Sequence, residues 1–257
     1  MTAIFWINLD SREDRRRFME AQFAELGLAA ERIAAVTPET LEARERGPRL
    51  SPSEACVTAS HCEAWRRMVK GQLPCALILE DDAYLSSALP VFLDEARPLM
   101  STLDLIRIET GRRRVRVAPA SERLNCGVTL QRVHSGQWGT AGYLISDRCA
   151  ARMLGEPRLF DMALDDIFFD PQGPAFAALD WRQCAPGLCI QGHELEAQGE
   201  LWRSDVTAQR RQRRASDPGR RKVRGWRAKF AREAERLRRQ GDLALAQARD
   251  FFAHGVR

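Results

Sequence analysis

Short apolar runs alternate along this chain with segments of helical spacing, and this alternation limits the possible folds more than any other feature. Strands are expected at residues 3–9, 32–36, 75–79, 103–108, 128–133 and 140–146. Helices are expected at residues 11–26, 51–70, 147–154 and around 166–169. Strands that alternate with helices indicate an α/β fold with a mostly parallel central sheet.

The helix over residues 51–70 has the clearest boundaries. Ser51 is followed by Pro52 and then by Glu54, which is a capping box with proline at the first helical position. Gly71 is expected to end the helix. One face carries the residues that we expect to be buried, namely Ala55, Thr58, Cys62, Trp65 and Val69.

Composition excludes several classes of protein. The chain has 257 residues, of which 44% are hydrophobic and 29% charged, so it is neither collagen-like nor wholly disordered. Its longest apolar runs fall far short of the ~20 residues that a membrane-spanning helix needs. The first ten residues lack a basic segment, and the seven cysteines form no CxxC pair. We therefore expect a cytoplasmic protein with reduced thiols and no cleaved signal peptide.

Charge divides the chain into a body over residues 1–206 and a tail over residues 207–257. Residues 209–240 hold fourteen Lys or Arg and three acidic residues, a net +11, and the remainder carries a net −6. A single apolar stripe runs through this basic segment at Val223, Trp226, Phe230, Ala234 and Leu237. This pattern favours an amphipathic helix on an anionic membrane surface. The alternatives are a helix packed on the body and an arginine-rich nucleic-acid tail. No nucleic-acid module is recognisable, so no nucleic-acid partner is expected.

Glu80, Asp81 and Asp82 directly follow an all-apolar strand. Ligands of open α/β sheets bind at the carboxyl ends of the strands, and three adjacent carboxylates repel each other unless a positive group lies among them. A divalent cation shared with substrate phosphates satisfies both conditions. The alternative is a surface turn in which Asp82 or Ser86 caps the next helix.

Several blocks in the same order resemble glycosyltransferase family 25, which contains bacterial lipooligosaccharide galactosyltransferases and animal procollagen galactosyltransferases. The blocks are Ile7-Asn-Leu-Asp10 with Arg12 and Arg15, Ser60-His61 with Trp65, Ile78-Leu-Glu-Asp-Asp82, Ile106-Arg-Ile-Glu-Thr110, Trp138-Gly-Thr-Ala-Gly-Tyr143, Leu164-Asp165 and Pro186-Gly-Leu-Cys-Ile-Gln191. The resemblance implies a GT-A-like nucleotide-sugar-binding fold, a UDP-sugar donor, Mn²⁺ or Mg²⁺, and transfer with inversion. It also implies galactose as the sugar and a saccharide acceptor, which we expect to be lipid-linked.

We assign the binding of the metal and of the donor diphosphate to the acidic triplet. Asp82 would hold the metal, with Glu80 or Asp81 in support on the donor side, and the metal would act on the departing diphosphate as a Lewis acid. A late histidine often completes the metal site in GT-A enzymes, and His193 is the candidate; the alternative is a histidine in a loop. His61 is expected to be a packing histidine of the 51–70 helix.

The nucleoside is assigned to the end of the first strand. Asn8 and Asp10 are placed to bind uracil or ribose, and Arg12 and Arg15 to reach phosphates, unless both arginines only line a solvated helix face. Further donor-side residues are expected at Gly139, Thr140 and Gln191.

An inverting transfer needs a base on the acceptor hydroxyl. Asp165 matches the position of that base in the family, and Asp166 is either an alternative base or the N-cap of the following helix. Trp138 and Tyr143 either stack on a sugar ring or pack in the core.

Three function classes follow from these observations. The first is a metal-dependent glycosyltransferase that acts on a surface glycolipid from the inner face of the cytoplasmic membrane, to which the basic tail would bind. The second is a glycosyltransferase of the same fold with a protein or peptide acceptor. The third is a non-catalytic basic module that binds a membrane or RNA, for which two carboxylate sites have no use.

Overall fold

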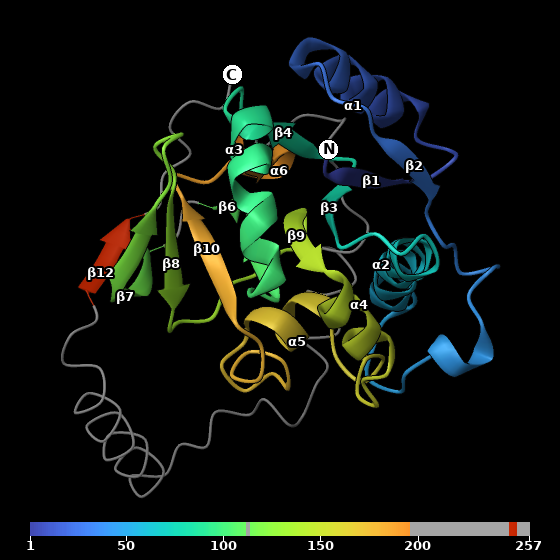
Figure 1. Cartoon of the computed structure of the whole chain (residues 1–257). Coiled ribbons are helices and arrows are strands. Elements are labelled where there is room, and N and C mark those ends of the chain that lie inside the picture. Colours follow the sequence, from blue (N-terminus) through green and yellow to red (C-terminus); the bar gives the residue numbers. More distant parts are fainter. Residues whose placement is uncertain (112–113, 196–246, 251–257) are drawn as a thin grey trace, which may run out of the picture.

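The computed structural model describes residues 1–111, 114–195 and 247–250 (Figure 1). The apolar stripe of the predicted tail helix and the boundary between residues 206 and 207 lie outside the described residues. The described chain is a mixed α/β structure with two sheets. None of its helices is long and apolar enough to cross a membrane.

The larger sheet has the strand order β12-β7-β8-β10-β5-β9-β3-β1-β2. Its strands are β1 (Ala3–Asn8), β2 (Glu31–Ala34), β3 (Cys75–Glu80), β5 (Leu105–Arg107), β7 (Arg114–Arg123), β8 (Thr129–Val133), β9 (Gly142–Ser146), β10 (Trp181–Ala185) and β12 (Gln247–Asp250). The smaller sheet has the order β4-β11-β6 and consists of β4 (Ala83–Leu85), β6 (Glu109–Thr110) and β11 (Cys189–Gln191).

The helices connect and cover these strands. They are α1 (Glu13–Leu26), α2 (Pro52–Lys70), α3 (Leu89–Ala96), α4 (Asp147–Leu154), α5 (Leu164–Phe169) and α6 (Gly192–Leu195), with short 3-10 turns η1 (Ala43–Glu45) and η2 (Arg97–Ser101). The capping box at Ser51 forms as expected, and its hydroxyl accepts a hydrogen bond from the backbone N–H of Glu54. Four of the five residues on the predicted buried face of α2 are buried, but Val69 is 40% exposed.

The expected mostly parallel sheet is wrong, because the larger sheet is mixed. Among the described strands of the larger sheet, only the pairs β1–β2, β1–β3 and β5–β10 are parallel. β9 lies between β3 and β5 and runs antiparallel to both. β7 and β8 form an antiparallel hairpin, whose turn contains Gly127 at φ +88°. A short turn of this kind can only reverse the chain, whereas a parallel pair needs a longer crossover.

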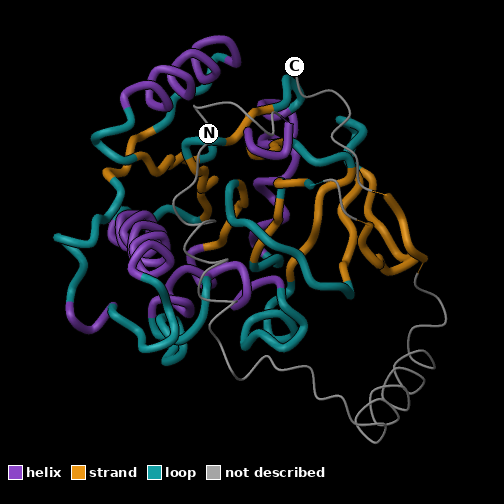
Figure 2. The backbone as a smooth tube through the Cα atoms, turned by 180° about the vertical axis from the view of Figure 1, so that it is seen from behind, coloured by secondary structure: helices purple, strands orange, loops and turns teal. Residues whose placement is uncertain are grey.

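Helices cover both faces of the larger sheet: α1 and α3 pack on one face, and α2, α4 and α5 pack on the other (Figure 1). The strand β3 contributes alternate residues to the two cores: Ala76 and Ile78 pack with α2, α4 and α5, whereas Leu77 and Leu79 pack with α1 and α3. Figure 2 shows this layer of strands from behind. All seven cysteines are free, as expected, and six of them are buried.

The topology brings several strand ends to one edge of the sheet. β1 and β3 are parallel neighbours, and β5 has the same direction as β3 because β9 is antiparallel to both. The carboxyl ends of these strands, at Asn8, Glu80 and Arg107, therefore lie at the same edge, where β9 begins at Gly142. The candidate site is built at this edge.

Candidate active site

Asp81, the middle residue of the acidic triplet, is part of a buried polar network. Its carboxylate accepts hydrogen bonds from the Asn8 side-chain amide at 2.7 Å and from the Arg15 guanidinium at 2.8 Å. The other end of the Asn8 amide accepts a hydrogen bond from Arg32 Nε at 3.0 Å. Three residues predicted to bind the donor are thus brought together from β1, α1 and the β3–β4 turn. The hydrogen bonds of Asp81 with Asn8 and Arg15 fix the positions of these side chains at this edge of the sheet.

Asp10 and Arg12 lie at the border of this network, where the Asn8 side-chain amide also donates to the carbonyl oxygen of Arg12 at 3.1 Å. The side chain of Asp10 is 81% exposed and forms an ion pair with Arg32. Arg12 donates from Nε and from a terminal nitrogen to the carboxylate of Asp14, at 2.9 and 2.7 Å. Both residues therefore lie on the surface beside the strand end.

Asp82 is buried and incompletely paired. It is 8% exposed, and its Oδ1 atom has no hydrogen-bond partner among the described residues. Burial and the nearby charge of Glu80 raise the pKa of Asp82 to about 7. The alternative interpretation as a surface turn that caps a helix is wrong, because β4 follows at once and α3 begins after Ala88. A buried carboxylate oxygen without a donor suits a cation, which is the property that the proposed metal requires.

Strand pairing brings the backbone of Gln191 and Gly192, directly before His193, beside the backbone of Asp82. β11 pairs with β4, which places Gln191 opposite Ala83, and the N–H of Gly192 donates to the carbonyl oxygen of Asp82 at 2.8 Å. The side chain of His193 is 43% exposed. Within the described ranges, no group of three or more His, Cys, Asp or Glu side chains is arranged to hold a metal. A cation at Asp82 would therefore need further ligands from the donor diphosphate and water, which is how Mg²⁺ is often held.

Asp165 is held by two backbone N–H groups. It lies in the first turn of α5 and is 5% exposed. Its Oδ2 accepts a hydrogen bond from the Gly139 N–H at 3.1 Å, and its Oδ1 accepts one from the Asp166 N–H at 3.0 Å. The N-cap of α5 is Ala163, so the expectation that Asp166 caps this helix is wrong.

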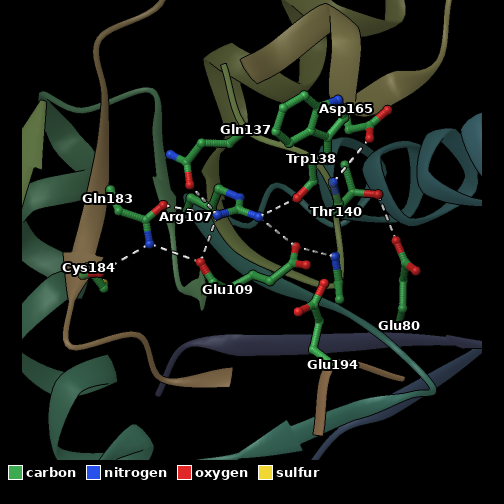
Figure 3. Close-up of polar contacts among 12 residues, drawn as sticks. Glu80, Arg107, Glu109, Gln137, Trp138, Thr140, Asp165, Gln183, Cys184 and Glu194 are labelled. Carbon is green, nitrogen blue, oxygen red and sulfur yellow. Dashed lines mark hydrogen bonds and ion pairs between the residues drawn. The ribbon is translucent and has the colours of Figure 1, made fainter. Parts of the chain in front are cut away.

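The loop before β9 joins Asp165 to the acidic triplet. While Gly139 binds Asp165, the adjacent Thr140 donates its hydroxyl hydrogen to Glu80 Oε1 at 2.6 Å (Figure 3). Gly139 has φ +92°, and a Cβ atom there would lie 2.3 Å from Glu109 Oε1. Both the backbone conformation and the lack of space for a side chain therefore require glycine. The geometry therefore gives Gly139 and Thr140 a positioning role between two carboxylates.

The sequence model of glycosyltransferase family 25, described as an LPS biosynthesis protein family, matches residues 1–168. The chain belongs to this family. It is therefore a glycosyltransferase, and the resemblance inferred from the ordered motifs is confirmed.

Similar proteins come from bacteria and animals. The chain is 30% identical over 212 residues to the lacto-N-neotetraose biosynthesis glycosyltransferase LgtB of Neisseria meningitidis serogroup B, an alignment that covers 77% of each chain. It is 30% identical over 204 residues to a glycosyltransferase 25 family member of Drosophila melanogaster, covering 71% of this chain and 32% of that protein. It is 29% identical over 185 residues to procollagen galactosyltransferase 1-A of Xenopus laevis, covering 64% and 30%. The chain thus spans about a third of these animal relatives.

Two charged residues that sequence reasoning missed support the same loop of this family 25 enzyme. Arg107 is 2% exposed and forms an ion pair with Glu109 at 3.2 Å. Its guanidinium donates hydrogen bonds to Gln137 Oε1 and to the carbonyl oxygen of Trp138, both at 2.7 Å, and to Gln183 Oε1 at 3.1 Å (Figure 3). Arg107 therefore anchors residues 137–138, directly before the N–H that binds Asp165.

Glu109, on β6, completes this hydrogen-bond network. Its Oε2 atom accepts a hydrogen bond from the Ala141 N–H at 2.9 Å. Burial raises the pKa of Glu109 to about 8, although the charge of Arg107 opposes the shift. The signal was present in the sequence: Arg107 and Glu109 alternate with the apolar Ile106 and Ile108, and buried charges are costly without partners.

The two aromatic residues proposed for sugar stacking differ. Trp138 is 43% exposed beside the candidate site, which is compatible with a ring that contacts a sugar. Tyr143 is fully buried in the core cluster below α2, so a stacking role for it is wrong.

Proposed function

We propose that this family 25 enzyme transfers galactose from UDP-galactose, with inversion, to a saccharide acceptor on a lipid-linked lipooligosaccharide or another surface glycolipid. The buried Oδ1 of Asp82, which has no hydrogen-bond partner among the described residues, is the observation that carries the proposal, because such an oxygen at the ligand-binding edge of the sheet is suited to bind a cation. The names of the bacterial and animal relatives support galactose. The GT-A-like assignment rests on the family and on the mixed sheet covered on both faces.

Asp82 and His193 would hold Mn²⁺ or Mg²⁺ together with the donor diphosphate, and the cation would stabilise the charge on departing UDP. Asp82 offers an oxygen that no described protein group uses, and its backbone lies beside Gly192, next to His193. Gln191 and the Asn8–Arg15–Asp81 network border the same edge and would contact the nucleotide. The exposed Asp10 and Arg12 would lie at its rim.

Asp165 is the proposed base. It would accept the proton of the acceptor hydroxyl while that oxygen forms a bond to the anomeric carbon and the bond from this carbon to the UDP oxygen breaks. Each carboxylate oxygen of Asp165 receives one backbone hydrogen bond. Those two bonds fix the carboxylate, so little reorientation is needed when the acceptor arrives.

The acceptor and the location of the enzyme are part of the same proposal. A cytoplasmic enzyme attached to the inner face of the membrane through residues 207–257 would meet a lipid-linked acceptor directly. The Xenopus relative is a procollagen galactosyltransferase, which favours a second candidate, an enzyme with a protein or peptide acceptor. The family assignment disfavours a non-catalytic basic module.

A donor screen tests the proposal. UDP-galactose, UDP-glucose and UDP-N-acetylglucosamine would be supplied with a panel of methyl glycosides, and UDP release would be measured with Mn²⁺. We expect UDP-galactose to give the highest kcat/KM and a β-linked product by NMR. An α-linked product would contradict the inverting scheme, and preference for another donor would contradict the assignment of galactose.

A further inference from the structure

A chain of polar atoms crosses the core below the candidate site. It consists of His61 and Trp65, one helical turn apart on α2, and Tyr143 on β9, and all three residues are fully buried. The Trp65 Nε1–H donates to the Tyr143 hydroxyl at 3.1 Å. That hydroxyl is 2.8 Å from His61 Nδ1, and His61 Nε2 is 3.4 Å from Glu80 Oε1.

Only one placement of the hydrogens satisfies every donor and acceptor in this group of polar side chains. Indole nitrogen can only donate, so the Tyr143 oxygen accepts from Trp65 and keeps one hydrogen to donate. If His61 Nδ1 carried the imidazole proton, the buried Tyr143 hydrogen would have no acceptor within the described part of the chain, and the bare Nε2 would face the Glu80 carboxylate. When Tyr143 donates to Nδ1, every group is satisfied, and the imidazole proton lies on Nε2, directed at Glu80.

The ring of His61 has little freedom to leave this position. It stacks on the ring of Tyr143 with centroids 5.6 Å apart and an interplanar angle of 23°. Glu80 therefore receives two donors on the same atom, one from His61 and one from the Thr140 hydroxyl. Among the described residues, no hydrogen bond is made to Glu80 Oε2. The arrangement turns one carboxylate oxygen toward the protein and leaves the other for a ligand.

We propose that His61 is a positioning residue, and that Tyr143 and Trp65 fix its Nε2–H tautomer so that it holds Glu80 in the orientation that binds the sugar-nucleotide donor. The proposal rests on the proposed function for the role of Glu80, but the tautomer follows from the buried contacts alone. It gives the Ser60-His61 and Trp65 motif a role in the site in addition to core packing. Hydrogen-bond partners of this kind that orient a ligand-binding group typically change affinity or activity by about 10- to 100-fold when removed.

Nitrogen-15 NMR of the full chain labelled at histidine would report the tautomer directly. We expect the His61 signals of an imidazole with its proton on Nε2. Tyr143→Phe should remove this preference and lower kcat/KM for UDP-galactose by about 10- to 100-fold, with little change in KM for the acceptor. Cys149→Ala is the matched control, because it also deletes one heavy atom from the same core cluster, and among the described residues the Cys149 side chain makes no hydrogen bond to His61, Trp65 or Tyr143.

Two variants of His61 separate positioning from packing. Glutamine can place an amide N–H near the position of Nε2, whereas asparagine can place one only near Nδ1. We therefore expect His61→Gln to retain more of the donor kcat/KM than His61→Asn, with similar losses of melting temperature in both.

Three results would overturn the proposal: a wild-type His61 protonated on Nδ1, equal activity of the Gln and Asn variants, or a Tyr143→Phe enzyme as active as Cys149→Ala. A protein with the Nε2–H tautomer that releases UDP from none of the three donors would support the tautomer and overturn the proposed function instead.

Discussion

Replacing Asp165 by asparagine should separate catalysis from donor binding. The substitution removes the proposed base, and positioned general-base catalysis is typically worth ~10²–10⁴-fold in rate, so kcat should fall by about that factor. Donor affinity should change little, because asparagine keeps the shape of aspartate and one acceptor oxygen.

The structure also predicts a cost in stability for this variant. Both carboxylate oxygens of Asp165 accept a backbone N–H, but asparagine has only one oxygen, so its NH₂ group must face one of the two donors. A buried hydrogen bond lost in this way costs about 1–3 kcal/mol. One kcal/mol corresponds to about 2–4 °C for a domain of this size, so the melting temperature should fall by roughly 2–12 °C.

Steady-state UDP release at saturating donor and acceptor would give kcat, calorimetric titration with UDP would give the affinity, and thermal unfolding would give the melting temperature. Asp166→Asn is the control on the same turn and should lower kcat much less. The base assignment is refuted by an Asp165→Asn enzyme with near-normal kcat. Loss of UDP binding would instead move Asp165 to the donor side.

The remaining predictions concern Asp82, Glu109 and Gly139. Asp82→Asn should remove the effect of Mn²⁺ on UDP affinity while the protein stays folded, and calorimetry that still shows the full effect would contradict this. Burial raises the pKa of Glu109 from 4.5 to about 8, so the stability that its bound proton contributes is complete below about pH 4.5 and is lost as the pH rises through 8. Melting temperature measured without metal should therefore fall across this window, and less steeply in Glu109→Gln; an unchanged slope would refute the assignment. Gly139→Ala should lower both kcat and stability, because its Cβ would collide with Glu109 and φ is +92°; wild-type kcat in this variant would show that the loop adapts.

Local signals explain which elements were predictable. The capping box at Ser51 and the glycine after Lys70 gave α2 almost to the residue, and β3 was evident because all its residues except the last are apolar. These signals act over a few residues and do not depend on distant partners. The direction of β9 does depend on distant partners. Its sequence predicts a strand, but only its packing between β3 and β5 makes it antiparallel to both.

The site residues show the same distinction between local signals and contacts with distant residues. Asp82 and Asp165 were predicted as site residues because they are acidic residues next to apolar elements and match the family motifs. The partners of Asp81 were not predictable, since Arg15 lies 66 residues away and meets it only when α1 packs on the sheet. Arg107 and Glu109 stand in a quoted family motif but were given no role, because their contacts with the loop at Trp138 and Ala141 form only in the folded chain.

The most direct test of the central claim is the affinity of the wild-type protein for UDP, measured by calorimetry in Mn²⁺ and again in EDTA. If Asp82 and the donor diphosphate share a cation, UDP should bind at least about tenfold more tightly with Mn²⁺, equivalent to ~1.4 kcal/mol or more. Equal affinity in the two buffers would contradict the account, because the unpartnered carboxylate oxygen of Asp82 would then have no cation to bind.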